Sequence, residues 1–255
     1  MTPLLKLENV TITFGGLTAV ESISFEVEKG RIFSLIGPNG AGKSTVFNII
    51  SGIYSPTAGR VYFKGKEITG DKAYKITSYG VARTFQNIRL FKNLTVLDNV
   101  KIGSHTRGKA GIVGALSRLG SAREEEKKVM SKSEEVLSVV ELWNKRDEPA
   151  KNLSYGDQRR LEIARALASS PELLLLDEPA AGMNAGEKQG LMEMIKKICG
   201  MGITVLLVEH DMKFVMGISD HVIVLDYGQI IASGTPEEVQ NDPAVIEAYL
   251  GKEAG

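Results

Sequence analysis

The chain of 255 residues is long enough for one large domain or two modest ones with a well-buried core. Its 31 lysines and arginines balance 31 aspartates and glutamates, which excludes an overall basic field that would attract nucleic acid. The single cysteine, Cys199, excludes an internal disulfide and is typical of a reducing compartment such as the cytosol. The N-terminal sequence lacks the pattern of a signal peptide, and no apolar run approaches the ~20 residues that cross a bilayer. We therefore expect any membrane role to come through a partner.

The first part of the chain predicts antiparallel β-strands. Apolar and polar residues alternate from Leu4 to Phe14 and again from Ile23 to Val27, before a turn at Lys29-Gly30. Phe14 stands just ahead of two glycines, where a large ring either stacks on a base or packs into the core. The pattern alone leaves both roles open.

The stretch GPNGAGKST lies between the apolar run 32–36 and a helical segment expected from Ser44 to Ile50. The spacing is that of a phosphate-binding loop: Gly37 is followed by four residues and then by Gly42-Lys43-Ser44. Glycines let backbone N–H groups approach phosphate oxygens, and the helix N-terminus adds partial positive charge. Lys43 can reach the β- and γ-phosphates, and the Ser44 hydroxyl can ligate magnesium. We therefore predict a nucleoside triphosphate held by Gly37, Pro38, Asn39, Gly40, Ala41, Gly42, Lys43, Ser44 and Thr45.

The middle of the chain predicts a change from strands to helices. Strands are expected over 60–63 and 80–85, the second running directly into Gln86. Helical spacing follows over 95–102, 122–142 and 158–168. The stretch 103–120, which is rich in glycine, serine and basic residues, is expected to be a solvated loop, in preference to a binding patch. We read residues 94–166 as a helical subdomain inserted into an α/β core.

The core resumes with a continuous apolar run over 172–176, typical of a strand buried on both faces. Helices are expected over 186–199, from Met212, and over 236–240 and 243–250, with strands over 203–208, 222–226 and 229–232. This alternation predicts a largely parallel sheet. The chain is thus interpreted as a single domain, 1–255, with residues 1–93 forming antiparallel strands and the phosphate-loop part of the core, 94–166 the helical subdomain, 167–235 the rest of the core, and 236–255 the C-terminal helices.

Four polar residues lie at or just beyond the ends of expected strands. Asp177 ends the buried strand, where a magnesium-orienting carboxylate is expected. Glu178 beside it is a candidate general base that polarises an attacking water. His210 follows the strand over 203–208, and Gln86 can ligate magnesium or position water through its amide oxygen.

The stretch Asn152–Gln158, NLSYGDQ, precedes a helix and contains serine and glycine where a helix N-terminus can bind an anion. By itself the same stretch is equally typical of a capped helix start.

The ordered set GPNGAGKST, Gln86, LSYGDQ, LLLLDEP and His210 resembles the ATP-binding subunit of ABC transporters over essentially the whole chain. The resemblance implies an α/β phosphate-loop NTPase core with a largely parallel sheet, an N-terminal antiparallel β subdomain and an inserted α-helical subdomain. It implies ATP and Mg²⁺ as cofactors and ATP hydrolysis as the activity. The implied site residues are the phosphate loop and Phe14, which stacks on adenine; Ser154, Gly156 and Asp157 of the family signature; Ser44, Gln86 and Asp177 at the metal; and Glu178, His210 and Gln86 in catalysis.

The chain departs from the family pattern at three positions. Tyr155 replaces a glycine of the usual LSGGQ signature, Asp157 replaces its glutamine, and Asn184 stands where an aspartate is usual. The segments VARTFQNIRLFKNLTVLDNV, DEPAAGMN, EHDMKFVMGISD and AYLG are similar to the ATPase subunits of branched-chain amino-acid importers, as is the loop over 103–121.

The resemblance implies two ATPase subunits facing each other head to tail, each ATP lying between the phosphate loop of one and the signature of the other. It implies a peripheral subunit at the cytoplasmic face of the membrane, docked on permease subunits near Gln86 and the helical subdomain, with a solute-binding protein as an indirect partner and no nucleic acid. The second ATPase subunit is either a copy of this chain or a paralogue. Powering the import of branched-chain amino acids is the function we predict.

Three alternative functions stay open. A lipid or lipopolysaccharide exporter uses similar short ATPase subunits. A soluble ABC ATPase acting on nucleic acid or ribosomes usually joins two ATPase units or carries a coiled-coil insertion, and this chain has neither. A nucleotide-gated binding module without turnover is disfavoured by Glu178 and His210.

Overall fold

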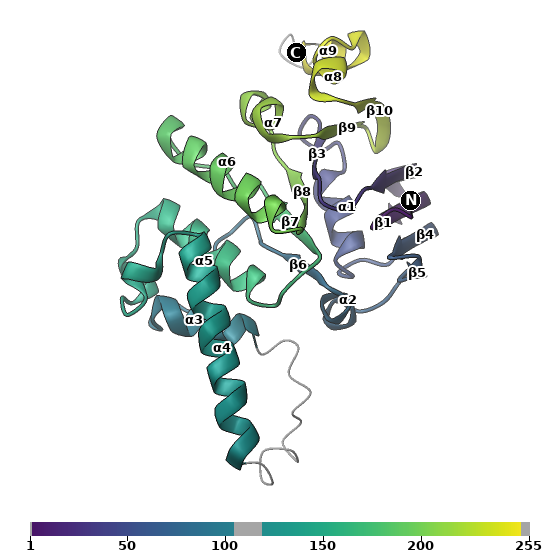
Figure 1. The fold of residues 1–255 in the computed structure, drawn as a ribbon. Helices are drawn as coiled ribbons and strands as arrows, with labels where there is room; N and C mark the ends of the chain where they lie inside the picture. The colour runs from purple at the N-terminus through teal and green to yellow at the C-terminus, as the bar shows by residue number, and fades with distance from the viewer. Residues whose placement is uncertain (1, 105–118, 251–255) are drawn as a thin grey trace. The chain divides into compact units, whose positions relative to one another are not determined.

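The computed structural model describes residues 2–104 and 119–250 and divides into two compact units (Figure 1). The first unit contains the chain up to Arg83 and from Glu172 onward, and the second is Thr84–Pro171. The expected loop over 103–120 is wrong at its ends, because residues 103 and 104 belong to a helix and residues 119 and 120 begin another. The remainder of that stretch lies outside the described residues.

A six-stranded sheet forms the centre of the first unit. Its order is β10-β9-β3-β8-β7-β6, and every described neighbouring pair is parallel except β10 with β9. The strands are β3 (Ile32–Ile36), β6 (Val81–Arg83), β7 (Leu173–Asp177), β8 (Thr204–Val208), β9 (His221–Asp226) and β10 (Gln229–Gly234). The apolar runs of β3, β7 and β8 are buried at every position, as expected for parallel strands covered on both faces. The predicted largely parallel α/β core is confirmed.

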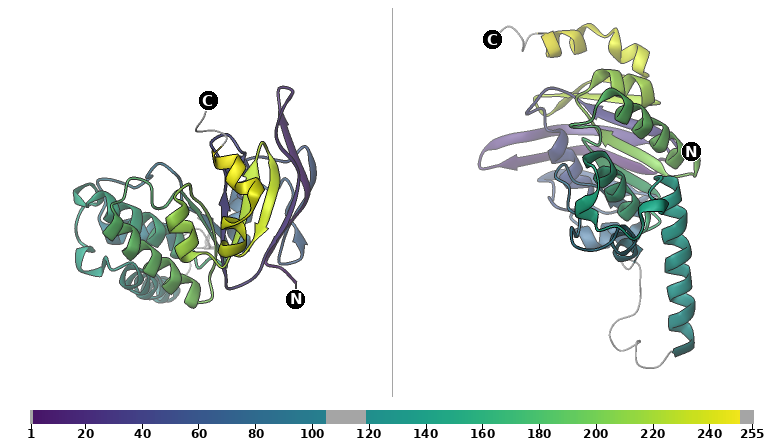
Figure 2. Two further views of the ribbon diagram at one scale, coloured as in Figure 1. Left: turned by 90° about the horizontal axis from the view of Figure 1, so that it is seen from above. Right: turned by 90° about the vertical axis from the view of Figure 1, so that its left-hand side faces the viewer.

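A four-stranded antiparallel sheet faces the central sheet (Figure 2). Its strands, in the order β2-β1-β4-β5, are β1 (Leu5–Phe14), β2 (Leu17–Val27), β4 (Ala58–Phe63) and β5 (Lys66–Glu67). β1 pairs with β2 from Leu5 opposite Val27 to Phe14 opposite Leu17. β2 therefore starts earlier than the alternation from Ile23 predicts, because two consecutive exposed residues, Glu21 and Ser22, interrupt the alternation after the buried Val20.

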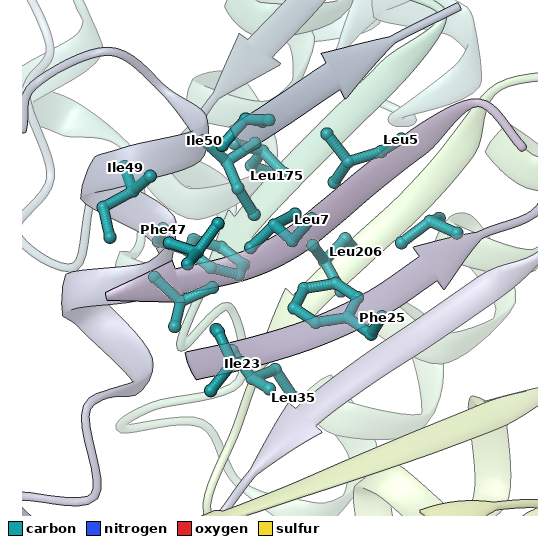
Figure 3. Packing of buried hydrophobic residues seen from close by; sticks show 14 of the residues in the cluster. Leu5, Leu7, Ile23, Phe25, Leu35, Phe47, Ile49, Ile50, Leu175 and Leu206 are labelled. Atoms are coloured by element: carbon teal, nitrogen blue, oxygen red, sulfur yellow. The ribbon is translucent and has the colours of Figure 1, made fainter. Parts of the chain in front are cut away.

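The core of the first unit lies between these two sheets and around helix α1 (Lys43–Ile50), as Figure 3 shows. Leu7 of β1, Phe47 of α1 and Leu206 of β8 have no solvent exposure. Removing such a phenylalanine side chain costs about 3–5 kcal/mol. The core therefore anchors α1 firmly, and with it the loop that enters α1.

The remaining helices of the first unit are α2 (Ala73–Tyr79), α6 (Ala185–Gly200), α7 (Met212–Ile218), α8 (Pro236–Gln240) and α9 (Pro243–Leu250). α8 and α9 have the bounds that the sequence predicts. α2 was not predicted; its C-cap is Gly80, whose φ of +112° favours glycine. The strand expected over 80–85 is also shorter, because its pairing with β7 ends at Arg83. Gln86 therefore lies beyond the end of β6 and does not end the strand.

The second unit is helical, with α3 (Val96–Ser104), α4 (Leu119–Val139) and α5 (Tyr155–Leu167), and single 3₁₀ turns at Trp143–Lys145 and Ala150–Asn152. Val136 and Val140 are buried as the spacing predicts, while the charged run 124–128 is exposed. A Cβ on Gly103 of α3 would lie 2.2 Å from the carbonyl oxygen of Arg165 in α5, so these helices pack at backbone distance. Each helix within residues 2–104 and 119–250 is too short or too polar to span a membrane.

Candidate functional site

The phosphate-binding loop connects β3 to α1, and its glycines are required by close packing. A Cβ on Gly37 would lie 2.0 Å from the carbonyl oxygen of Leu225, and a Cβ on Gly42 would lie 2.8 Å from that of Ala19. Gly42 caps α1 with a φ of +103°, in the region that favours glycine. Side chains at these positions would displace the loop from β9 and β2. The loop shape is thus fixed by neighbouring backbone on two sides.

Lys43 lies inside this loop and is only 7% exposed. Its Nζ donates hydrogen bonds to the carbonyl oxygens of Gly37 at 2.6 Å and Pro38 at 2.8 Å. Asn39, Gly40 and Ser44 are exposed along the same loop. The amine is therefore positioned where the backbone turns, beside the N-terminus of α1, which favours anions.

The strand register brings the other candidate residues of the first unit to the same sheet edge. Val208 of β8 pairs with Leu35 of β3 on one side and with Asp177 of β7 on the other. The phosphate loop, Glu178 and His210 therefore all follow carboxyl ends of adjacent parallel strands. Ligands of open α/β sheets bind at this edge.

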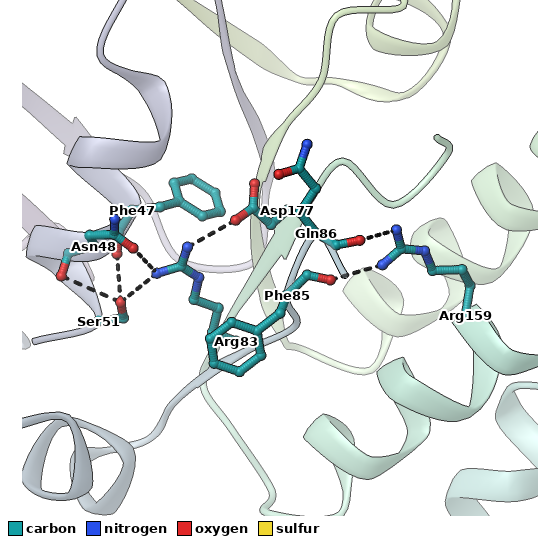
Figure 4. A network of polar contacts seen from close by, with 8 residues as sticks. All are labelled: Phe47, Asn48, Ser51, Arg83, Phe85, Gln86, Arg159 and Asp177. Atoms are coloured by element: carbon teal, nitrogen blue, oxygen red, sulfur yellow. Dashed lines mark hydrogen bonds and ion pairs between the residues drawn. The ribbon is translucent and has the colours of Figure 1, made fainter. Parts of the chain in front are cut away.

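Asp177 is buried and forms an ion pair that the sequence analysis missed (Figure 4). Its Oδ2 accepts a hydrogen bond from Arg83 Nη2 at 2.8 Å, and both side chains are less than a tenth exposed. Arg83 Nη1 also donates to Asn48 Oδ1 at 2.7 Å and to Ser51 Oγ at 2.8 Å. A planar guanidinium thus joins the carboxylate at the end of β7 to the helix that follows the phosphate loop.

Glu178 is partly buried and adopts a φ of +46°, a left-handed conformation that is uncommon for a non-glycine residue. Its N–H donates to the Val208 carbonyl oxygen at 2.9 Å, which holds the turn against β8. The His210 side chain is 60% exposed. Glu209 lies between the end of β8 and His210 in the sequence. It is only 1% exposed, and burial raises the pKa of its carboxyl. The sequence analysis did not single out Glu209. The available signal was a carboxylate directly after an apolar strand.

Phe14 is 44% exposed, so the alternative that it packs into the core is wrong. Its ring meets Tyr54 edge-on, with the ring centroids 5.2 Å apart. Tyr54, itself 37% exposed, was not singled out in the sequence. The pair forms an aromatic surface at the end of β1, suited to contact a planar base.

In the second unit, Ser154 caps helix α5. Its Oγ accepts a hydrogen bond from the Asp157 N–H at 3.2 Å, and Gly156 is buried within the first turn. The Asp157 carboxylate accepts from Lys145 Nζ at 2.6 Å, and this hydrogen bond raises the pKa of Lys145. The capped helix start is therefore present, and its exposed serine stands at a helix N-terminus. Asn184 in the first unit likewise caps α6, in a reciprocal capping box with Glu187.

Gln86 is exposed, and its backbone is fixed by a residue that the sequence analysis missed. Arg159 of α5 donates to the carbonyl oxygens of Phe85, at 2.8 Å, and of Gln86, as Figure 4 shows. Glu162, one turn along α5, pairs with Arg159 at 3.2 Å and accepts from the Arg89 N–H. The helix that carries Ser154 therefore also holds the Gln86 segment within the second unit.

The donor set of the first unit fits magnesium. The Ser44 hydroxyl and the Asp177 carboxylate offer the hard oxygen ligands that this ion prefers, and phosphate and water would supply the others. The described residues contain no cluster of three or more histidine, cysteine, aspartate or glutamate side chains that would hold a metal by itself. A metal here would therefore bind together with the nucleotide.

Comparison with known proteins assigns the chain to a family. A family model described as ABC transporter matches residues 20–181, and one described as branched-chain amino acid ATP-binding cassette transporter matches residues 229–255. The chain is 44% identical to the high-affinity branched-chain amino acid transport ATP-binding proteins BraF of Pseudomonas aeruginosa and LivG of Escherichia coli K12, over 98% of each chain.

Solved structures give the same result. An ATP-binding cassette of an ABC transporter in its ADP conformation has a TM-score of 0.86 and 35% identity, covering 98% of this chain and all of that one. A dimeric cassette bound to ADP and phosphate after hydrolysis has a TM-score of 0.75 and 28% identity, covering 91% and 98%. The chain therefore belongs to the ABC transporter family, as one of its ATP-binding and ATP-hydrolysing subunits.

Proposed function

We propose that this subunit hydrolyses ATP to drive the import of branched-chain amino acids through a membrane permease. The observation that carries the proposal is the 44% identity to BraF and LivG over 98% of the chain, together with the C-terminal match over residues 229–255. The C-terminal match favours the importer over lipid export. Residues 229–255 lie outside the catalytic motifs, and the family model that matches them is described as branched-chain amino acid ATP-binding cassette transporter.

Nucleotide binding is assigned to the first unit. Residues 37–45 hold the phosphates through backbone N–H groups, and Lys43 places its charge beside them. Phe14 stacks on the adenine, supported edge-on by Tyr54. Ser44 and Asp177 would hold magnesium, which would supply positive charge to the β- and γ-phosphates.

Hydrolysis is assigned to the loops that follow β7 and β8. Glu178 accepts a proton from the attacking water, and its carboxylate is directed by a turn that β8 holds through the Val208 carbonyl. His210, which is exposed after the neighbouring strand, donates a hydrogen bond to the γ-phosphate in this proposal. Arg83 keeps the Asp177 carboxylate in one orientation through its ion pair.

The second unit serves the nucleotide of a second ATPase subunit. Ser154, Gly156 and Asp157 lie at the N-terminus of α5, which favours a negatively charged ligand. The proposal is supported by the dimeric cassette among the similar structures. The partner subunit is a copy of this chain or a paralogue. Permease subunits dock near Gln86 at the cytoplasmic face of the membrane, and a solute-binding protein delivers the amino acid to them.

One variant tests the hydrolytic site. Glu178→Gln keeps the size of the side chain but removes the proton acceptor, so hydrolysis should slow by about 10²–10⁴-fold while ATP binding survives. The matched control is Glu172→Gln at the opposite end of β7, which should hydrolyse ATP at the unmodified rate. An unchanged rate for Glu178→Gln would rule Glu178 out as the base.

The same variant tests the composite site. With hydrolysis blocked, the ATP-bound dimer should accumulate, either of this chain or with a co-expressed paralogue, and chromatographic sizing with and without ATP measures it. Adding Ser154→Arg places a long cation at the α5 N-terminus and should abolish the dimer while monomeric ATP binding persists. If the double variant dimerises as well as Glu178→Gln alone, Ser154 does not face a partner's nucleotide.

Substrate class is tested by uptake of labelled leucine, isoleucine and valine in cells that lack this chain. Uptake should fall, and expression of the unmodified chain, but not of Lys43→Ala, should restore it. Normal uptake in the absence of any compensating paralogue contradicts the import proposal. Loss of lipid export in the same cells would favour the exporter.

A further inference from the structure

Glu209 is a buried carboxylate whose hydrogen bonds join the two catalytic loops. It follows β8 directly and is 1% exposed. Its Oε1 accepts a hydrogen bond from the Ala180 N–H at 2.7 Å, and its Oε2 accepts from the His210 N–H at 3.2 Å. Its Oε2 also lies 3.9 Å from Nδ1 of the His210 ring. Burial raises the pKa of the Glu209 carboxyl, and the negative charge of Glu178 adds to this effect.

The contacts of Glu209 complete a two-way connection around Glu178. The Glu178 N–H donates to the Val208 carbonyl oxygen at 2.9 Å, while the Ala180 N–H, two residues on, donates to the Glu209 side chain. The turn after β7 is therefore attached to the turn after β8 on both sides of Glu178. Its left-handed φ of +46° is a conformation that persists where surrounding contacts determine it.

We propose that Glu209 is a positioning residue for hydrolysis: it locks the turn that carries Glu178 onto the turn that carries His210, so that base and histidine keep one relative geometry. This inference rests on the proposed function of Glu178. A carboxylate is needed because both of its oxygens accept from N–H donors. Glutamine has one oxygen and one NH₂ group, so one backbone N–H would meet another donor.

The test is Glu209→Gln, measured for kcat, for KM and for the affinity of a fluorescent ATP analogue. A displaced base lowers kcat, by about 10–100-fold for a misplacement of about 1 Å. KM and nucleotide affinity should stay within about twofold, because the phosphate-loop contacts lie on other residues. The matched control is Asp220→Asn, which alters a carboxylate that accepts from the Ile32 N–H at the opposite edge of the same sheet. Its kcat should be unchanged.

A double-variant cycle separates positioning from general stabilisation. If Glu209 acts through Glu178, adding Glu209→Gln to Glu178→Gln should lower the residual rate by less than about twofold. A full second loss of 10-fold or more overturns the proposal, as does an unchanged kcat for Glu209→Gln alone. If Glu178→Gln itself hydrolyses at the normal rate, the failure belongs to the proposed base instead.

Urea unfolding and ATP binding establish that each variant is folded. If Glu209→Gln does not fold, Glu209→Asp takes its place in the same cycle, because it keeps both acceptor oxygens and the charge and shortens the side chain by one CH₂ group. A kcat loss for Glu209→Asp that vanishes in the Glu178→Gln background supports the proposal, and a loss that multiplies overturns it.

Discussion

Replacing Arg83 by methionine removes the buried cation from the network around Asp177 while keeping much of the side-chain volume. The Asp177 carboxylate, which is 7% exposed, loses its ion-pair partner, and Asn48 and Ser51 each lose a hydrogen bond from the guanidinium. Removing one partner of a buried ion pair costs about 3–5 kcal/mol, chiefly because the remaining charge is left uncompensated. We therefore expect Arg83→Met to lower the free energy of unfolding by that amount.

Urea unfolding followed by circular dichroism measures this change, with Arg31→Met as the control. Arg31 pairs with Glu28 at 2.9 Å, but the two side chains are 52% and 61% exposed, so its loss should cost about 0–1 kcal/mol. Adding Asp177→Asn to Arg83→Met removes the buried charge that Arg83 paired with and should recover part of the loss. The reasoning is refuted if Arg83→Met loses no more stability than Arg31→Met. It is also refuted if the double variant loses more stability than the losses of Arg83→Met and Asp177→Asn added together.

Three further predictions follow from the described contacts. Lys43→Ala removes a charge-assisted contact worth about 1.5–3 kcal/mol and should weaken ATP binding roughly ten- to a hundredfold in equilibrium titrations; undiminished binding by the folded variant contradicts the assignment. Phe14→Ala should weaken ATP binding about five- to tenfold, whereas Phe14→Tyr should bind normally because it retains the ring; equal losses for both variants would exclude stacking. Burial raises the pKa of Glu162 above its usual value of 4.5, so its contribution to stability is present below that value and is lost as pH rises through the folded-state pKa. We therefore expect the stability difference between the unmodified chain and Glu162→Gln, measured as free energy of unfolding, to fall as pH rises from about 4.5. A difference that stays flat or rises would contradict the raised pKa of Glu162.

The sequence predicted the elements whose signals are local. The continuous apolar runs of β7 and β8 identified buried parallel strands, and the proline starts of α8 and α9 gave helices with the observed bounds. The glycine pattern of the phosphate loop was readable because only glycine tolerates that approach of neighbouring backbone. α2 was missed because only Ile76 of its seven residues is buried, which leaves no amphipathic pattern.

The partners of the site residues were not predictable from local patterns. Arg83 and Asp177 are 94 residues apart, and Glu209 and Ala180 are 29 apart, so their contacts depend on the strand order. Gln86 was expected at a strand end, yet the chain leaves the sheet at Arg83, and Arg159 binds the carbonyls of Phe85 and Gln86 within the second unit. The available sequence signal for a distant partner was a charged side chain at or just after the end of an apolar strand, as at Arg83 and Glu209.

The left-handed backbone at Glu178 makes glycine an easily tolerated replacement at this position. A φ of +46° is strained for glutamate and relaxed for glycine, so replacement by glycine relieves strain of order 1 kcal/mol and offsets the greater flexibility of the unfolded chain. A single base change converts either glutamate codon into a glycine codon. On the proposed role of Glu178 as the base, a single base change therefore gives a chain that folds but no longer turns over ATP.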